Sequence, residues 1–246
     1  MERHGRYAVT MACVSLTPLA AFALFNWIMD PLQFYRKAAY TPEFSLQQRY
    51  QNPGLAKNYP YDTAVIGSSL AESLAPSRVE ALLGVRSINL SFKGASAFEM
   101  NRILRVAIRS GRLKRALWCM DIFAFRGAPD RTAQEEGDFP YHLYDRNPFN
   151  DARYLLNLDV FRSSANLLLD SLRGRRREPM DLDQLHNSYS APEAYSENAV
   201  LAKWEKESAA YDRGVRRFSK DPFTLNVLRE SFDRNALALI RDHPAI

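Results

Sequence analysis

Residues 62–73 read DTAVIGSSLAES, a short apolar β-type run that stops at Gly-Ser-Ser and continues into a helix-forming sequence. A strand–turn–helix junction places small hydroxyls at the carboxyl edge of a sheet. The helix N-terminus supplies free N–H groups and a positive dipole end there. Open α/β proteins bind ligands and hold nucleophiles at this edge. Ser68 and Ser69 are therefore the first candidates for functional residues.

A regular alternation of strand and helix patterns surrounds this junction. We predict strands over Thr63–Ile66, over Val85–Leu90 and within Arg115–Phe125, with helices over Leu70–Leu83 and Ala97–Arg109. Strands that alternate with helices of about a dozen residues favour βαβ units and an α/β fold with a parallel sheet. Right-handed crossovers predict the strand order 2-1-3.

The second half of the chain has a helical pattern. After a loop over residues 127–150, we predict helices over Asp151–Leu172, Ala191–Val215 and Pro222–Arg241. The first of these has an apolar face made of Leu155, Leu158, Phe161, Ala165, Leu168 and Leu172. Only three strands are visible in the sequence, and an open sheet of three strands leaves long unpaired edges. We therefore expect the fold to require a further portion beyond Ile246.

The N-terminal segment has the character of a membrane anchor. No charged residue lies between Arg6 and Asp30, and Tyr7–Met29 would span roughly 35 Å as a helix, more than the ~30 Å hydrocarbon core of a bilayer. Basic residues precede the segment, which predicts a cytoplasmic N-terminus. A cleavable signal peptide is the alternative, but no small-residue cleavage site follows the apolar run. We predict an uncleaved signal-anchor in the inner membrane and a periplasmic or extracytoplasmic domain.

Composition limits the remaining possibilities. The chain has 246 residues, a formal charge of +5 and 46% hydrophobic residues, which suits one domain with an appendage. The basic excess is partly local, within Arg173–Arg177, and does not indicate nucleic-acid binding. Cys13 lies in the anchor and Cys119 in a predicted core strand, so no disulfide framework or metal site is expected.

The predicted organisation has three parts. Residues 1–30 form the cytoplasmic N-terminus and the anchor, and the lipid bilayer is the expected partner of Tyr7–Met29. Residues 31–60, which show no clear period, form a juxtamembrane linker. Residues 61–246 form the α/β domain, with a helical insertion over about 127–220.

Three short segments lie at predicted strand ends: Gly67–Leu70, Asn89–Ser96 and Trp118–Asp121. In order and spacing they resemble the blocks of the SGNH (GDSL-like) hydrolase superfamily over about Tyr61–Arg126. The chain looks most similar to the membrane-anchored, extracytoplasmic bacterial members, some of which belong to polysaccharide acyl-transfer or esterase systems. The resemblance implies a flavodoxin-like three-layer sandwich around a parallel sheet.

The resemblance also implies roles for individual residues. It places the nucleophile at Ser69, with Ser68 where the block usually has Asp, and an oxyanion-hole N–H at Gly94. The third block usually reads Gly-x-Asn-Asp; Asp121 matches its Asp, and Met120 stands at the Asn position. Methionine cannot donate a hydrogen bond, and loss of one oxyanion-hole donor typically costs about 100- to 1000-fold in turnover.

The family also requires Asp-x-x-His near the C-terminus, because a serine hydroxyl is a weak nucleophile without an adjacent base. Asp183 and His186 have this spacing, although about 60 residues follow them, more than the family pattern has. The other histidines, His4, His142 and His243, lack the spacing or lie before the anchor. Either His186 is the base, or it lies in a polar loop and the base belongs to sequence beyond Ile246.

Two functions are consistent with these residues. The first is a serine esterase or O-acyltransferase that acts on acyl groups of cell-surface carbohydrate or exopolysaccharide, with the acylated polysaccharide as substrate. The alternative is an inactive or truncated SGNH-like module that binds or assembles with cell-envelope partners. The serines and Gly94 also suit an ordinary turn and helix cap, and Asp121 suits a cap or a hydrogen bond to the serine turn. No glycine-rich nucleotide pattern is present, so no cofactor is expected.

Overall fold

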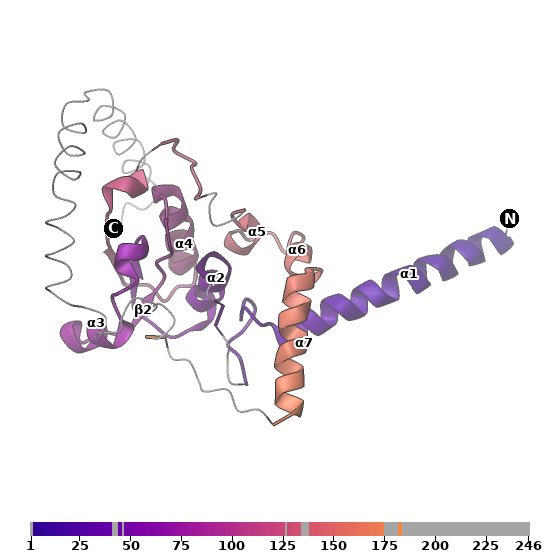
Figure 1. The fold of residues 1–246 in the computed structure, drawn as a ribbon. Helices are drawn as coiled ribbons and strands as arrows, with labels where there is room; N and C mark the ends of the chain where they lie inside the picture. Colours follow the sequence, from indigo (N-terminus) through magenta and orange to yellow (C-terminus); the bar gives the residue numbers. More distant parts are fainter. Residues whose placement is uncertain are drawn as a thin grey trace, which may run out of the picture. The chain divides into compact units, whose positions relative to one another are not determined.

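The computed structural model describes residues 2–40, 44–45, 47–125, 127–133, 138–174 and 182–183 (Figure 1). The described chain is mixed α/β, with a three-stranded parallel sheet and seven α-helices. It divides into two compact units. Unit 1 comprises residues 1–60, 106–111 and 140–181, and unit 2 comprises residues 61–105, 112–139 and 182–246.

The sheet of unit 2 consists of β1 (Thr63–Ile66), β2 (Ser87–Asn89) and β3 (Arg115–Trp118). The order is β2-β1-β3 and both pairings are parallel, so the predicted order and the predicted parallel sheet are confirmed. All residues of β1 and β2 are buried, whereas β3 is exposed at its first residue and half-buried afterwards.

The central strand β1 sets the register of the sheet. Thr63 lies opposite Ser87 of β2 and opposite Arg115 of β3. Val65 of the same strand is fully buried and belongs to an apolar cluster with Ala71. The turn after β1 is therefore packed back onto the strand from which it emerges.

The prediction of one continuous helix over residues 70–83 is wrong for the first half of that range. The chain forms a 3-10 turn, η1 (Ser69–Ala71), and then the helix α3 (Pro76–Leu83). Because α3 begins with a proline, the preceding Ala75 is extended, with φ −60° and ψ 129°. The predicted end at Gly84 is confirmed, and this glycine has a left-handed φ of 63°.

Helix α4 (Ala97–Arg109) has the predicted bounds. Its N-terminus is a reciprocal capping box: the Glu99 N–H donates to Ser96 Oγ at 3.2 Å, and the Ser96 N–H donates to Glu99 Oε2 at 2.9 Å. This arrangement satisfies two backbone donors that a helix start would otherwise leave unpaired.

The predicted third strand, placed within an apolar run that extends to Phe125, is shorter than that run. β3 ends at Trp118, and a second 3-10 turn, η2 (Ile122–Phe125), follows. Asp121 starts this turn, because its carboxylate accepts the Phe123 N–H at 2.8 Å. An aspartate that binds the backbone two residues ahead favours a turn over a continuing strand.

Unit 1 is helical. It contains α1 (Glu2–Met29), α2 (Gln48–Asn58), α5 (Tyr141–Tyr144), α6 (Ala152–Leu155) and α7 (Leu158–Leu172). Helix α1 packs against α6 and α7, and α2 packs against α5 (Figure 1). The predicted aperiodic segment over residues 31–60 therefore contains a helix. The buried polar side chains of α2, namely Gln48, Arg49, Gln51 and Asn52, explain the absence of an apolar period.

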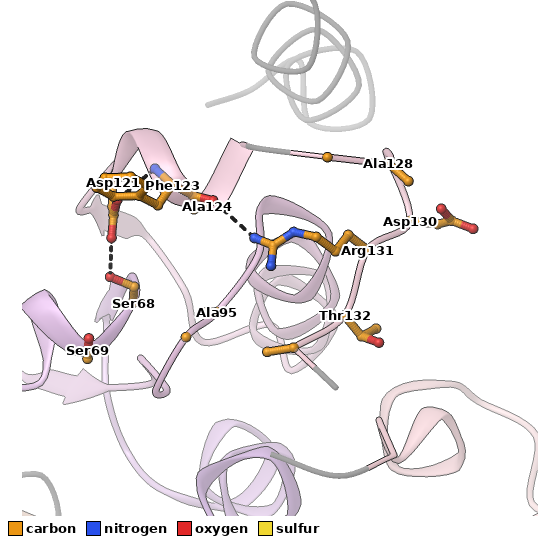
Figure 2. Close-up of a pocket in the computed structure, with 13 residues that line it drawn as sticks. Ser68, Ser69, Ala95, Asp121, Phe123, Ala124, Ala128, Asp130, Arg131 and Thr132 are labelled. Atoms are coloured by element: carbon orange, nitrogen blue, oxygen red, sulfur yellow. Dashed lines mark hydrogen bonds between the residues drawn. The ribbon is translucent and has the colours of Figure 1, made fainter. Parts of the chain in front are cut away.

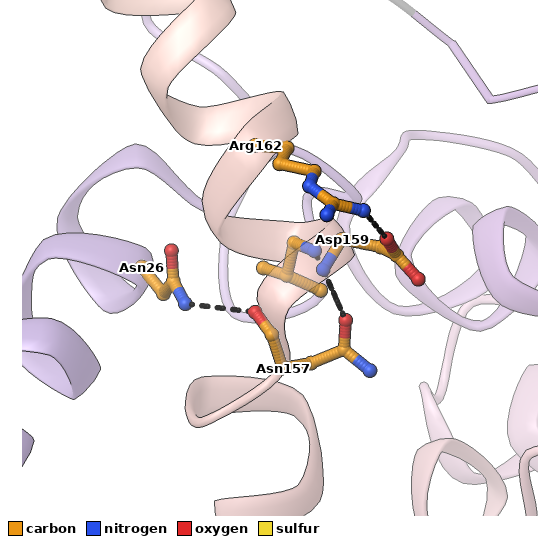
Figure 3. A network of polar contacts seen from close by, with 5 residues as sticks. Asn26, Asn157, Asp159 and Arg162 are labelled. Atoms are coloured by element: carbon orange, nitrogen blue, oxygen red, sulfur yellow. Dashed lines mark hydrogen bonds and ion pairs between the residues drawn. The ribbon is translucent and has the colours of Figure 1, made fainter.

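The helix predicted over residues 151–172 is divided into α6 and α7. Asn157 separates them and caps α7, since its side-chain oxygen accepts the N–H groups of Asp159 and Val160 at 2.8 and 3.1 Å (Figure 3). The Asn26 side chain of α1 donates to the Leu155 carbonyl at 2.9 Å and ties this break to α1.

The predicted apolar face of that helix is only partly confirmed. Phe161 stacks on Phe22 of α1, with ring centroids 4.6 Å apart. Leu158 and Leu172 are instead mostly exposed, and Leu167 is the buried leucine of α7.

A buried carboxylate holds the end of α1. Asp30 follows the helix with a φ of 42° and is 2% exposed. Its oxygens accept the N–H groups of Phe34, Tyr35 and Arg36 at 2.9, 2.9 and 3.1 Å, and the Tyr154 hydroxyl at 2.9 Å. Burial raises the pKa of the Asp30 carboxyl, and these hydrogen bonds oppose that rise.

The predicted transmembrane helix is not supported by the structure. None of the helices in the described part of the chain combines the length and the apolar character that crossing a bilayer requires. Helix α1 nevertheless runs through the whole predicted segment and includes Pro18. Several of its apolar side chains are more than half exposed, among them Met11, Leu16 and Leu19.

We predict that Asp30→Asn destabilises the protein more than Tyr154→Phe does. The asparagine amide would turn a donor toward backbone donors, which should cost about 2–3 kcal/mol. Removal of the tyrosine hydroxyl removes its bond to Asp30 and the 3.3 Å bond from the Leu32 N–H, together worth about 1–2 kcal/mol. Urea denaturation of the full chain measures both losses. Equal losses in the two variants would contradict the assigned role of the carboxylate.

Candidate functional site

A cavity of about 850 Å³ lies in unit 2 at the carboxyl ends of the strands (Figure 2). Its walls include Ser68 and Ser69 after β1, Gly94 after β2, Asp121 after β3, and residues of the loop 127–133. Three of the four predicted site residues therefore line one cavity. A volume of this size accommodates a small organic ligand.

Ser68 holds the serine turn in place. It is 4% exposed, and its hydroxyl donates to Asp121 Oδ2 at 2.8 Å (Figure 2). Ser68 is also the N-cap of η1, with its Oγ accepting the Leu70 N–H at 3.5 Å. Asp121 thus makes both of the contacts that the sequence left as alternatives: it binds the serine turn and it caps the turn η2. Ser69 is half-buried on the cavity wall.

Gly67 gives this turn the space it needs. A Cβ atom at this position would lie 2.6 Å from the Ala71 Cβ and 3.0 Å from the Cys119 Cβ. The chain after β1 can approach the end of β3 only because that atom is absent. The sequence indicates a glycine turn here, but the close approach to Cys119 depends on the strand order.

Asn89, which the sequence pattern did not single out, connects the second strand to the same turn. Its amide donates to the carbonyls of Ala71 and Leu74 at 2.8 and 3.0 Å. Its oxygen accepts the N–H and hydroxyl of Ser91 at 2.9 and 2.5 Å. In the sequence, the one indication of this role was that Asn89 is a polar residue at the end of an apolar strand. The side chain joins η1 to the segment that leads to Gly94.

Gly94 meets a conformational requirement. Its φ is 60°, a left-handed value that favours glycine, and a Cβ atom would meet only the Ala133 Cβ, at an ordinary 3.6 Å. It lies on the cavity wall with Ser69, as the predicted pairing requires.

In the third segment, Trp118–Asp121, the position where the family pattern has Asn carries no side chain that can donate a hydrogen bond. Met120 is 58% exposed and is not among the residues that line the cavity. The neighbouring Cys119 is a free, half-buried thiol whose pKa is raised by burial. Cys13 is also a free cysteine.

Arg131 is a cavity residue that the sequence did not indicate. Its Nη2 donates to the Phe123 carbonyl at 3.0 Å, and its own carbonyl accepts the Ser96 hydroxyl. A Cβ atom at Gly127 would lie 3.0 Å from the Cδ of Arg131, and Gly127 has a left-handed φ of 87°. One arginine in a charged loop carries no sequence signal of its own, because its position depends on these tertiary contacts.

The predicted base, His186, lies outside the described residues. Its motif partner Asp183 is described, and Oδ1 of this residue accepts the Ser77 N–H at 2.9 Å in the first turn of α3. An acidic side chain stabilises a helix N-terminus in this position. His142 belongs to unit 1, where burial lowers its pKa. Among the described residues that line the cavity there is no histidine.

In the described residues no cluster of three or more His, Cys, Asp and Glu side chains could hold a metal ion. No family model, curated protein or solved structure matches the chain. The resemblance to SGNH hydrolases therefore rests on the blocks in the sequence.

We predict that Gly67→Ala destabilises the protein more than Gly84→Ala. The new methyl group at position 67 would overlap two β-carbons, which should cost about 2–3 kcal/mol. At position 84 nothing lies within 4 Å, so only the left-handed backbone is penalised, by about 1 kcal/mol. Chemical denaturation of both variants tests the difference. If Gly84→Ala is the more damaging change, the packing described for the serine turn is incorrect.

Proposed function

We propose that unit 2 is a serine esterase or O-acyltransferase domain of the SGNH (GDSL-like) type. The proposed substrates are acyl groups on cell-surface carbohydrate or exopolysaccharide. The main support is that Ser69 and Gly94 share the wall of one cavity, at the carboxyl edge of a parallel sheet with the order 2-1-3. That edge is where α/β folds hold ligands and reacting groups.

In this proposal Ser69 is the nucleophile and Ser68 positions it. Ser68 is buried and its hydroxyl is engaged by Asp121, whereas Ser69 is half-buried on the cavity wall. Ser69 would attack the acyl carbon and release an alcohol, and water or an acceptor hydroxyl would then take the acyl group from the serine. Backbone N–H groups at Ser69 and Gly94 would stabilise the negative oxygen that forms.

The base that activates Ser69 is a separate part of the proposal. Asp121 does not suit this role, because its two oxygens accept the Ser68 hydroxyl and the Phe123 N–H. We assign the base to His186, on the spacing of its motif alone.

A non-catalytic module that binds or assembles with cell-envelope partners is the second candidate. Two observations favour it. Met120 cannot donate and lies off the cavity, and none of the described lining residues is a histidine. Such a module would keep the cavity and lose the chemistry.

A fluorophosphonate probe separates the two candidates. We expect the full-length chain to be labelled and Ser69→Ala to abolish labelling. Ser68→Ala should slow labelling about 10-fold without abolishing it, because the bond to Asp121 and the longer cap of the Leu70 N–H, which position the turn, are lost. Mass spectrometry of the labelled peptide identifies the reacting serine. An unlabelled wild-type chain, with native unfolding behaviour, would refute the enzyme and leave the binding module.

The same assay tests the base with a matched pair of variants. His186→Ala should reduce the labelling rate to near background, and His142→Ala in unit 1 should leave it unchanged. Equal rates for both variants would remove His186 from the mechanism.

Membrane attachment through Tyr7–Met29 is a second part of the proposal. The segment contains no charged residue, and its exposed apolar side chains include Leu16 and Leu19. Attachment by this segment would hold unit 2 on the periplasmic face of the inner membrane, where cell-surface carbohydrate is accessible.

We predict that the full chain expressed in bacteria resists alkaline carbonate extraction from the membrane fraction. The double variant Leu16→Arg and Leu19→Arg should be released, since an arginine near the centre of a bilayer helix costs about 2.5–3.5 kcal/mol. Leu82→Arg, at an 83% exposed position of α3, is the control and should stay in the pellet. Release of the wild-type chain would exclude an integral anchor.

A further inference from the structure

Phe123 is a large apolar side chain on the wall of the cavity in unit 2 (Figure 2). The turn η2 carries two phenylalanines in opposite environments. Phe125 is 1% exposed and lies against Trp118, with ring centroids 5.7 Å apart, whereas Phe123 is 62% exposed and lines the cavity. The other residues of the described wall have small or polar side chains. Phe123 is therefore the one large apolar surface that the described wall offers to a ligand.

The backbone of Phe123 is held on both sides. Its N–H donates to Asp121 Oδ1 at 2.8 Å, and its carbonyl accepts Arg131 Nη2 at 3.0 Å. The other oxygen of Asp121 accepts the Ser68 hydroxyl at 2.8 Å. One carboxylate thus connects Phe123 to the turn that carries Ser69. A rigid aromatic side chain on a held backbone loses little conformational entropy when a ligand covers it.

Two aliphatic side chains are exposed at the same end of the cavity. Leu70 of η1 and Ile122 of η2 are both more than half exposed. Each lies within two residues of the Ser68–Asp121 hydrogen bond, which joins the two turns. Exposed apolar groups beside a cavity indicate a surface that a ligand or partner covers. A ligand that leaves the cavity past Phe123 would therefore meet further apolar surface.

The chemistry of this surface favours an alkyl chain over a sugar ring. A sugar ring carries hydroxyls along its edge, and those facing aliphatic side chains would lose hydrogen bonds to water. An alkyl chain suffers no such loss, and its affinity rises up to about fourfold for each CH₂ group that is buried. The cavity volume of about 850 Å³ accommodates an ester group together with such a chain.

We propose that Phe123, with Leu70 and Ile122 beside it, binds the alkyl chain of a medium-chain acyl group. As a statement about the substrate, this inference rests on the proposed function, because it describes the acyl group that Ser69 would accept. Phe123 then determines specificity for chain length. An acetyl group, which has a single methyl, would leave most of the ring uncovered.

A photoreactive ligand tests this binding without requiring any reaction at Ser69. The probe is an N-methyl octanamide with a diazirine at the end of its chain, and the amide replaces the ester. The full-length chain is irradiated with the probe in the absence of alkyl detergents, whose chains would compete. Mass spectrometry identifies the labelled peptides. We expect the label on the peptides that contain η1 or η2.

Competition by unlabelled ligands measures which chemistry the site prefers. The competitors are N-methyl acetamide, N-methyl hexanamide and N-methyl octanamide, with methyl glucoside as the sugar. We expect the concentration that halves labelling to fall at least about 10-fold from the acetamide to the octanamide, because several CH₂ groups are buried. Methyl glucoside should not compete.

Four variants assign the binding to this surface. Phe123→Ala should weaken competition by the octanamide about 10-fold. Phe123→Leu should retain most of it, because an aliphatic side chain still packs against an alkyl chain. Ile122→Ser should weaken the octanamide more than the acetamide. Phe149→Ala is the matched control and should change nothing, since Phe149 is an exposed phenylalanine of unit 1.

The outcomes are separable from those of the fluorophosphonate assay. Chain-length preference that is lost in Phe123→Ala and kept in Phe149→Ala supports the alkyl site, even if the fluorophosphonate never labels Ser69. Equal competition in the wild type and Phe123→Ala, equal competition by acetamide and octanamide, or competition by methyl glucoside alone overturns it, even if Ser69 is labelled. If Phe123→Ala fails to fold, Ile122→Ser decides: an unchanged chain-length preference overturns the site.

Discussion

The close approach of the chain around Gly67 is the constraint on which the site depends. Without a Cβ atom at this position, the segment leaving β1 can pack against Cys119 beyond β3. That contact places the Ser68 hydroxyl oxygen 2.8 Å from Asp121 Oδ2 and leaves Ser69 on the cavity wall. A larger residue would separate two strand ends that the parallel order places side by side. The position of both serines therefore follows from the absence of one carbon atom.

A second constraint fixes the other part of the cavity wall. Ser96 and Glu99 cap helix α4, and the same two side chains also bind the loop 127–133: the Ser96 hydroxyl donates to the Arg131 carbonyl, and Glu99 accepts the Ala133 N–H at 3.3 Å. A helix start is a rigid support, because its capping bonds order the first turn. The loop that carries Arg131 is thereby attached to regular structure, as precise binding sites require.

The sequence predicted β1 and α4 to the residue, because each is an uninterrupted periodic run between clear turn signals. It failed where local and tertiary effects compete. The proline that starts α3 divides one predicted helix, Asn157 divides another, and α2 buries polar side chains that no apolar period reveals. For the site, the resemblance of three strand-end segments pointed to Ser69, Gly94 and Asp121, which line one cavity. Arg131 was not, since its place depends on partners at least eight residues away.

The hydrogen bond between Ser68 and Asp121 has a structural role in this cavity. A carboxylate beside a serine suggests an acid–base pair, but here both oxygens accept hydrogen bonds that shape the turns η1 and η2. Both oxygens of Asp121 are therefore engaged in holding the two turns. Activation of Ser69 must then come from a group other than Asp121. The hydrogen bonds of Asp121 therefore shape the cavity wall whether or not the serine reacts.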